Sequence, residues 1–103
     1  MSQLARAPEV TEAQFMRQVK DLAKVFGYDF IYHPFLSKWS EQGWPDLALA
    51  RRRDGRFLLA ELKRNSGKLT MRQSEVIDLL RFCGLTVHVW RPADLPEIAE
   101  ALR

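Results

Sequence analysis

Cysteine is almost absent from this chain of 103 residues, which contains Cys83 alone. A single cysteine cannot form an internal disulfide or a cysteine-rich zinc site, and its apolar neighbours predict that Cys83 is a small core residue. Long hydrophobic runs are also absent, since no stretch approaches the ~20 apolar residues that cross a bilayer. The N-terminal segment lacks the apolar stretch of a signal peptide. We therefore expect one cytoplasmic domain over residues 1–103, with residues 1–9 as a loose arm.

Positive charge is modest overall, at a net +3, but it is unevenly distributed. Residues 51–72 contain eight Lys or Arg against two acidic residues and so carry +6, which leaves −3 for the rest of the chain. A solvated surface and hairpin would explain this cluster, and the alternative is a footprint for a polyanion such as DNA. The second interpretation gives these candidate DNA-binding residues: Lys38, Arg51, Arg52, Arg53, Arg56, Arg64, Lys68 and Arg72.

Periodicity and capping signals predict the order helix, three strands, helix, strand, helix. Thr11 with Gln14, Thr70 with Gln73, and an Asp-Glu pair at 94 and 97 have the spacing of helix N-terminal caps. The expected helices span 11–26, 70–83 and a short segment from 94, and the expected strands span 28–33, 46–52, 56–63 and 86–90. Strand, helix, strand over 56–90 implies a right-handed crossover between parallel strands. The predicted fold class is α/β, with a mixed four-stranded sheet flanked by helices.

The Asp-Gly pair at 54 and 55 predicts a two-residue type I′ turn between the second and third strands. Such a turn would pair Ala48 with Glu61 and Asp46 with Lys63. Because side chains alternate along a strand, the two carboxylates and the amine share one face, with the carboxylates roughly 7 Å apart on a diagonal. Pro-Asp is also common turn chemistry, and Glu61 and Lys63 could belong to an exposed sheet face.

Two more polar residues are predicted on inward helix faces, close to the helix starts. Glu12 falls within the apolar stripe that contains Phe15 and Val19, and Gln73 falls within the stripe that contains Ile77. Glu12 could simply be favoured there by the helix dipole, and Gln73 could simply complete its capping box. Their convergence with the strand residues indicates a site at the rim of the sheet.

Facing carboxylates make an oxygen-rich pocket suited to Mg²⁺ or Mn²⁺. Such an ion polarises a phosphate oxygen and lowers the pKa of bound water. Lys63 would stand near that water or the phosphate and stabilise developing negative charge. The pattern predicts metal-assisted phosphodiester hydrolysis, with these candidate catalytic residues: Glu12, Asp46, Glu61, Lys63 and Gln73.

The chain resembles a known family in these residues. Pro45-Asp46 and, after fourteen intervening residues, Glu61-Leu62-Lys63 resemble the Pro-Asp…Asp/Glu-x-Lys signature of the restriction-endonuclease-like superfamily. The segments TEAQFMRQV, YHPFLSKWSEQGWPDLAL, LLAELKRNSGKLTMRQ and VHVWRP resemble its VRR-NUC branch, over roughly residues 11–98. One departure is Val76, where members often carry an aromatic residue.

The resemblance implies a restriction-endonuclease-like nuclease fold and assigns roles in the site. Metal ligands are implied at Asp46, at Glu61 and at the backbone carbonyl of Leu62, with Glu12 in the acidic cluster as a candidate further ligand. It assigns Lys63 to catalysis and Gln73 to a supporting role. Small stand-alone members resemble Holliday-junction resolvases and act as dimers, whereas larger relatives carry the domain in flap-cutting repair enzymes.

The expected function is a Mg²⁺- or Mn²⁺-dependent, structure-selective DNA endonuclease that resolves four-way junctions as a homodimer, without a membrane partner. A nuclease for flaps or other branches is one alternative, and an inactive DNA-binding module on a nuclease fold is another. An intact Asp46, Glu61 and Lys63 argue against the inactive module, and the +6 segment argues against a domain with no nucleic-acid role. The roles of His33, Trp39 and Trp44 stay open, whereas the alternation of the last strand favours a structural role for His88.

Overall fold

The computed structural model describes residues 9–34 and 41–103 of the chain. The elements follow in the order α1 (Glu12–Val25), β1 (Phe30–Tyr32), β2 (Leu47–Arg51), η2 (Arg52–Asp54), β3 (Arg56–Leu62), α2 (Met71–Phe82), β4 (Val87–Trp90), η3 (Pro92–Asp94) and α3 (Leu95–Leu102). The predicted order of helices and strands is confirmed, and their bounds lie within two residues of the expected ones. Within the described ranges, no helix has the length and hydropathy needed to cross a membrane.

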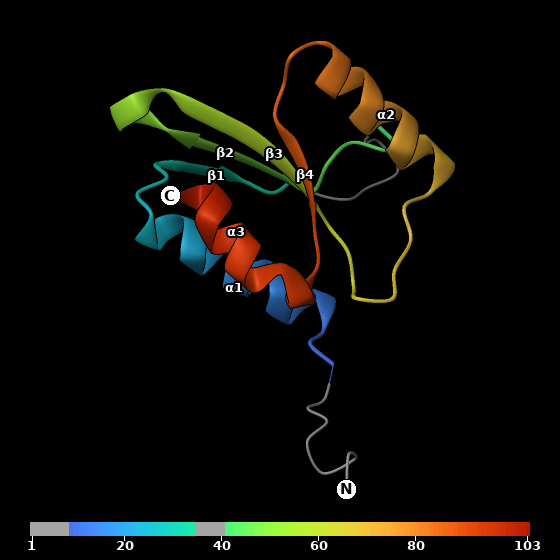
Figure 1. The fold of residues 1–103 in the computed structure, drawn as a ribbon, viewed down its shortest axis with the longest axis horizontal. Helices are drawn as coiled ribbons and strands as arrows, with labels where there is room; N and C mark the ends of the chain where they lie inside the picture. Colours follow the sequence, from blue (N-terminus) through green and yellow to red (C-terminus); the bar gives the residue numbers. More distant parts are fainter. Residues whose placement is uncertain (1–8, 35–40) are drawn as a thin grey trace, which may run out of the picture.

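The four strands form one mixed sheet in the order β1-β2-β3-β4. Two antiparallel pairings join β1 to β2 and β2 to β3, and α2 supplies the crossover to the parallel pairing of β3 with β4. Helices α1 and α3 lie together on one face of the sheet, and α2 lies on the other (Figure 1). This arrangement confirms the predicted α/β, restriction-endonuclease-like architecture.

The connection between β2 and β3 is longer than expected. It contains four residues, 52–55, with a 3-10 turn and with Gly55 in the left-handed conformation at φ 67°. Ala48 therefore pairs with Leu59 and not with Glu61. The predicted two-residue turn is wrong, but the register error is two residues, and a shift of two leaves every side chain on its predicted face.

Arg51 explains the longer connection and is a structural residue. Its guanidinium donates to both carboxylate oxygens of Asp54 at 2.9 Å, and this hydrogen bonding holds the pKa of Asp54 below its ordinary value. It also donates to three main-chain carbonyls, those of Phe26, Leu102 and Arg103. Because Arg51 is only 3% exposed, its assignment to DNA binding is corrected: this arginine ties the hairpin to the C-terminal helix.

The main core lies between the sheet and the pair α1 and α3, where buried side chains include Phe15, Val19, Leu49 and Ile98. The second core, under α2, is small, and Ile77 is the one buried residue of that helix. The expectation that Cys83 is buried is wrong, because it follows the last turn of α2 on an exposed surface. Helix α2 is therefore attached to the sheet by a narrow apolar contact.

The capping predictions hold for two of the three helices. Thr11 and Thr70 both form complete capping boxes with the glutamine three residues later. At the third helix, Asp94 makes no side-chain cap for α3, because its carboxylate accepts from the backbone N–H of Arg91 at 2.9 Å. The predicted Asp-Glu cap is wrong, and a 3-10 turn stands before α3 instead.

Candidate active site

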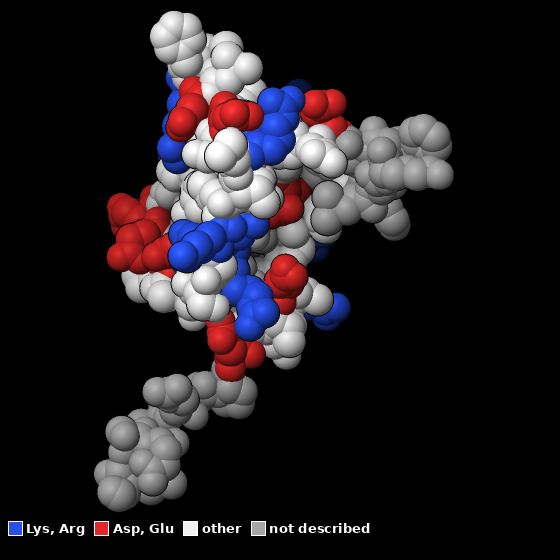
Figure 2. All heavy atoms as spheres, turned by 90° about the vertical axis from the view of Figure 1, so that its right-hand side faces the viewer, with Lys and Arg blue, Asp and Glu red and all other residues white. Residues whose placement is uncertain are grey.

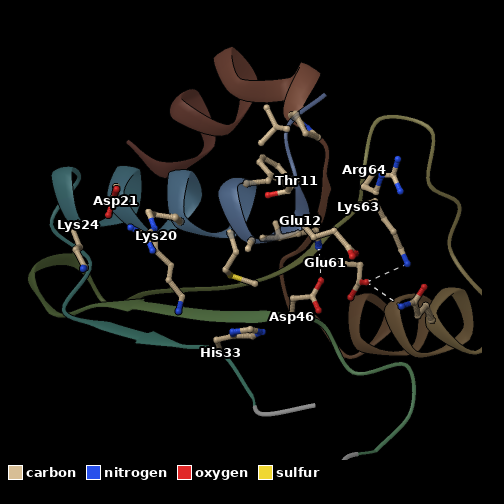
Figure 3. Close-up of a pocket in the computed structure, with 18 residues that line it drawn as sticks. Thr11, Glu12, Lys20, Asp21, Lys24, His33, Asp46, Glu61, Lys63 and Arg64 are labelled. Atoms are coloured by element: carbon tan, nitrogen blue, oxygen red, sulfur yellow. Dashed lines mark hydrogen bonds and ion pairs between the residues drawn. The ribbon is translucent and has the colours of Figure 1, made fainter. Parts of the chain in front are cut away.

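Two carboxylates and an amine meet where β2 begins and β3 ends (Figure 3). Extending the observed β2–β3 pairing by one residue places Asp46 opposite Glu61. Glu61 is only 2% exposed, and its Oε2 atom lies 3.7 Å from the Nζ atom of Lys63. All three side chains line a single cavity. The structure thus brings together the residues that the sequence placed on one face.

Gln73 joins this group from the first turn of α2. Its Oε1 atom accepts from the backbone N–H of Thr70 at 2.9 Å, and its Nε2 atom donates to Glu61 Oε2 at 3.0 Å. The predicted capping contact of Gln73 is therefore confirmed, and the same side chain also contacts a candidate site residue. The same amide fixes the start of α2 and orients the buried carboxylate.

Pro45 determines how the β2–β3 ladder ends. Even-numbered residues of β3 turn their backbone groups toward β2, and the position opposite Leu62 is the fully buried Pro45. Proline has no N–H, so it cannot donate to the Leu62 carbonyl as the next ladder residue would. The Leu62 N–H donates instead to Asp46 Oδ2, at 2.8 Å. This local chemistry leaves the Leu62 carbonyl at the mouth of the site without a ladder partner from β2.

Burial strongly perturbs the ionisation of Glu61. Removal from water and, second, the negative charge of Asp46 raise the pKa of Glu61 to about 7, although the Lys63 amine acts in the opposite direction. A glutamate with this pKa is partly protonated near neutral pH in the absence of a nearby cation. The site is therefore short of positive charge.

The donor set fits a divalent cation. Glu61 Oε1 is a buried oxygen for which the described residues offer no hydrogen-bond partner. A cation bonded to this oxygen and to Asp46 would supply the missing partner and the missing positive charge. Mg²⁺ in proteins is commonly held by one or two carboxylates and several waters. Two carboxylates and the Leu62 carbonyl would suffice for such an ion.

Glu12 lies in the same cavity but at its margin. It is an exposed residue at the first position of α1, and it lines the cavity together with Asp46 and Glu61. Across residues 9–34 and 41–103, no group of three or more His, Cys, Asp or Glu side chains has the spacing of a metal site. Glu12 is therefore placed near the acidic cluster, outside direct ligand geometry with it.

The candidate DNA-binding residues separate into two groups. Arg52, Arg53 and Arg56 are at the tip of the β2–β3 hairpin, and Arg56 donates to the main-chain carbonyl of Arg103 at 2.8 Å. The strand length from Arg56 to Glu61 puts this tip roughly 17 Å from the carboxylates. The predicted single basic footprint is thus divided between the two ends of β3.

The second group follows the end of β3, on the side of the cavity. Arg64 lines it, Lys68 is exposed in the following loop, and Arg72 forms ion pairs with Glu41 and Glu75 at 3.1 and 3.6 Å. On this side of the molecule, basic and acidic side chains are interspersed (Figure 2). Two further residues named from the sequence, Lys38 and Trp39, lie outside the described residues.

The remaining histidine and tryptophan residues discussed from the sequence are placed as follows. His33 lines the cavity, whereas His88 stacks on Trp90 with ring centroids 5.0 Å apart. Burial lowers the pKa of His88, which is consistent with the structural role favoured for it. Trp44 is 41% exposed, beside the start of β2.

Sequence reasoning missed one set of cavity residues. Arg17, Lys20 and Lys24 also line the cavity, from successive turns of α1. Their spacing of three and then four residues is the signal that could have revealed them, because it places them on one helical face. The sequence analysis used only the apolar stripe of this helix.

No curated protein and no solved structure matches the chain. The model of the VRR-NUC domain family matches residues 33–94, which is more than half of the chain. The matched segment includes Asp46, Glu61, Lys63 and Gln73, whereas Glu12 precedes it. The chain therefore belongs to the VRR-NUC domain family of nucleases.

Proposed function

We propose that this nuclease is a divalent-metal-dependent endonuclease that cuts DNA at branch points, with four-way junctions as its substrate and a homodimer as its active form. One observation carries the proposal: the buried Glu61 carboxylate lies on the same strand face as the half-buried Asp46, with the Lys63 amine 3.7 Å from Glu61 Oε2. Phosphodiester hydrolysis requires a place for positive charge beside the phosphate and an activated water, and this arrangement supports both.

Each residue of the site has a role in this proposal. Asp46, Glu61 and the Leu62 carbonyl would hold Mg²⁺ or Mn²⁺, and Glu12, which lines the same cavity, would bind a water of the ion. When bound, the ion supplies a Lewis acid and lowers the pKa of water. Lys63 orients the nucleophile and stabilises charge on the phosphate, and Gln73 holds one oxygen of Glu61 in place.

The uncovered part of the sheet supports the homodimer. On the face that carries α2, register places Phe30, Ala50 and Phe57 in one row across three strands, with Tyr32 in the next row. The three aromatic side chains are 44–55% exposed and together leave roughly 300 Å² of apolar surface in water. An interface needs about 800 Å² from each partner, so this patch could form its centre. Two copies would also provide the two sites needed to cut a symmetric junction.

A flap or other branched substrate with an unpaired strand is the second candidate. The observation in its favour is the extension of the cavity along α1, beyond the carboxylates, toward basic side chains. Both candidates share the same chemistry and differ in the DNA that reaches the site.

A cleavage assay tests the proposed chemistry. Labelled junction, flap and linear duplexes are incubated with Mg²⁺, Mn²⁺ or chelator, using the wild type and the variants Glu61→Ala and Lys63→Ala. We expect metal-dependent cutting of branched DNA and a loss of at least ~100-fold in rate in both variants, by analogy with removal of transition-state stabilising groups. Glu97→Ala, an exposed change on α3, is the control. Cleavage that survives both chelator and Glu61→Ala would refute the mechanism, and tight binding without cleavage would favour the inactive module.

The mass in solution tests the dimer. Light scattering after size exclusion is expected to give twice the chain mass for the wild type and a single chain mass for Phe57→Glu, because a charge in the centre of an apolar interface is costly. Val25→Glu introduces the same charge at another exposed apolar residue, on α1, and should remain dimeric. A monomeric wild type at assay concentrations would exclude the homodimer.

A further inference from the structure

The active-site cavity is larger than the metal-binding group needs. It has a volume of about 790 Å³ and extends from Glu61 and Gln73 along α1 as far as Lys24. Glu12 and Lys24 are twelve residues apart on this helix, which corresponds to a length of about 18 Å. A metal ion with its waters would occupy only one end of such a space.

The charges along the cavity are separated. Glu12, Asp46 and Glu61 lie at one end, and Arg17, Lys20 and Lys24 line the wall that continues from it. In the close-up, the labelled Lys20 and Lys24 point from α1 toward the strands, and His33 lies on the opposite side of the opening (Figure 3). The second part of the cavity is therefore a basic groove, formed by these three side chains of α1.

The three cations of the basic groove have no acidic partner. All 13 acidic residues of the chain lie in the described ranges, and no ion pair within 4.0 Å involves Arg17, Lys20 or Lys24 there. Asp21 is the one acidic residue beside them on the cavity wall. Unpaired positive charge in a cleft concentrates anions at that place. The groove thus fits a chain of phosphates that continues from the metal-binding end.

The dimensions select a single strand over a duplex. The volume of about 790 Å³ is the space open to the centres of water-sized molecules. Spread over about 18 Å, it is roughly 7 Å across, which corresponds to about 10 Å between the atoms of the walls. A B-DNA duplex is wider than its own major groove, which is ~12 Å wide, so a whole duplex cannot enter this cavity. At ~3.4 Å per stacked nucleotide, the groove length corresponds to about five nucleotides.

We propose that the basic groove along α1 binds an unpaired DNA strand that is continuous with the strand being cut. Lys20 and Lys24 contact its phosphates, Arg17 contacts a phosphate closer to the metal-binding end, and the half-buried Met16 offers an apolar surface to a sugar or base. This inference rests on the proposed nuclease function and, of its two candidate substrates, favours branched DNA with an unpaired segment beside the cleaved bond over the fully paired four-way junction.

Binding without cleavage tests the inference. The probe is a fluorescein-labelled duplex with a short thymidine overhang at its 3′ end, its 5′ end or neither, and anisotropy is measured in chelator. We expect the wild type to bind one overhang duplex more tightly than the blunt duplex. Each single-strand phosphate contact contributes about 0.7 to the slope of log affinity against log salt, so Lys20→Gln/Lys24→Gln should reduce that slope by about 1.4 and abolish the overhang preference.

The matched control removes a cation elsewhere. Arg103→Gln changes an exposed side chain whose ion pair is with Glu100, at the hairpin end of the fold, and should leave slope and preference unchanged. Thermal melts establish that each variant is folded, and Lys24→Gln alone, at an exposed position, should lower the slope by about 0.7.

The two hypotheses fail in different ways. Equal binding of blunt and overhang duplexes by the wild type, or an unchanged salt slope in the double variant, refutes the proposal that the groove binds an unpaired strand. Metal-dependent cleavage can still be observed in that case. Absence of cleavage in any metal, with the overhang preference intact, overturns the proposed function and leaves the groove supported.

Discussion

Replacement of Glu61 by glutamine should stabilise the metal-free protein at pH 8 and have a much smaller effect, about a quarter as large, at pH 5. The pKa of Glu61 is raised from 4.5 to about 7 in the folded protein. Well below pH 4.5 the carboxyl is protonated in both folded and unfolded states, so no penalty arises. Above pH 7 it is ionised in both states, and the folded state bears the full penalty of the buried charge. The free energy of unfolding of the wild type therefore contains a contribution from protonated Glu61 that is present in acid and is lost as the pH rises through about 7.

The size of the effect follows from the shift. The raised pKa corresponds to about 3 kcal/mol at 1.36 kcal/mol per pH unit, and water in the open cavity screens this to about 2 kcal/mol. For a domain of this length, such a change in the free energy of unfolding raises Tm by about 10 °C. Glutamine resembles the protonated carboxyl in shape and keeps a partner for Gln73, so the gain should appear as the pH increases.

Thermal melts followed by circular dichroism in chelator, between pH 5 and pH 8, measure this difference. Glu97→Gln, which removes an exposed carboxylate from α3, is the control, and its difference from wild type should stay nearly constant. A Glu61→Gln difference that is the same at pH 5 and pH 8 would refute the argument from burial. Adding Mg²⁺ at pH 8 should then stabilise the wild type, by about 1.4 kcal/mol at ten times its dissociation constant, and should not stabilise the variant.

Three other substitutions have defined outcomes. Pro45→Ala provides an N–H opposite the Leu62 carbonyl, so the rise in Tm on adding Mg²⁺ should shrink. Ile77→Ala should lower the free energy of unfolding by about 2–4 kcal/mol in denaturant titrations, because Ile77 is the buried anchor of α2, whereas Leu79→Ala on the exposed face should change it by less than about 0.5 kcal/mol. Arg51→Ala should lower Tm clearly, because three main-chain carbonyls lose their donor, and a Tm equal to wild type would contradict its structural role.

The order of elements could be predicted from the sequence because its signals are local. The two Thr-Gln capping boxes, the glycines after helices and the alternation in the strands each act within a few residues. The type of turn between β2 and β3 could not be predicted in this way. Arg51 reaches across the fold to the C-terminal segment while it holds Asp54, and this tertiary contact favours a four-residue connection over the locally preferred two-residue turn.

The carboxylates of the site could be predicted for a related reason. Side-chain alternation has a period of two, so an even register error changed the partner of Glu61 and not its face. Charge counting along the chain was less informative, because residues 51–72 run from one end of the sheet to the other and then into a loop. The sum of +6 treated three separate places as one surface: a buried arginine, the hairpin tip and the residues near the cavity. The count also gave no signal for α1, because the acidic residues of this helix offset the charge of the three basic residues in the groove.

Helix α2 is held by few buried contacts and yet carries Gln73, which orients Glu61. Segments with little buried apolar surface open more often than the strands at the centre of a fold, and their amides exchange hydrogen faster. Each local opening of α2 would withdraw the donor from Glu61 and enlarge the cavity on that side. The order of the carboxylate site is thus linked to the docking of one weakly anchored helix. If DNA contacts Arg72 or Lys68 near the start of α2, it should reduce both the opening rate of the helix and the disorder of the site.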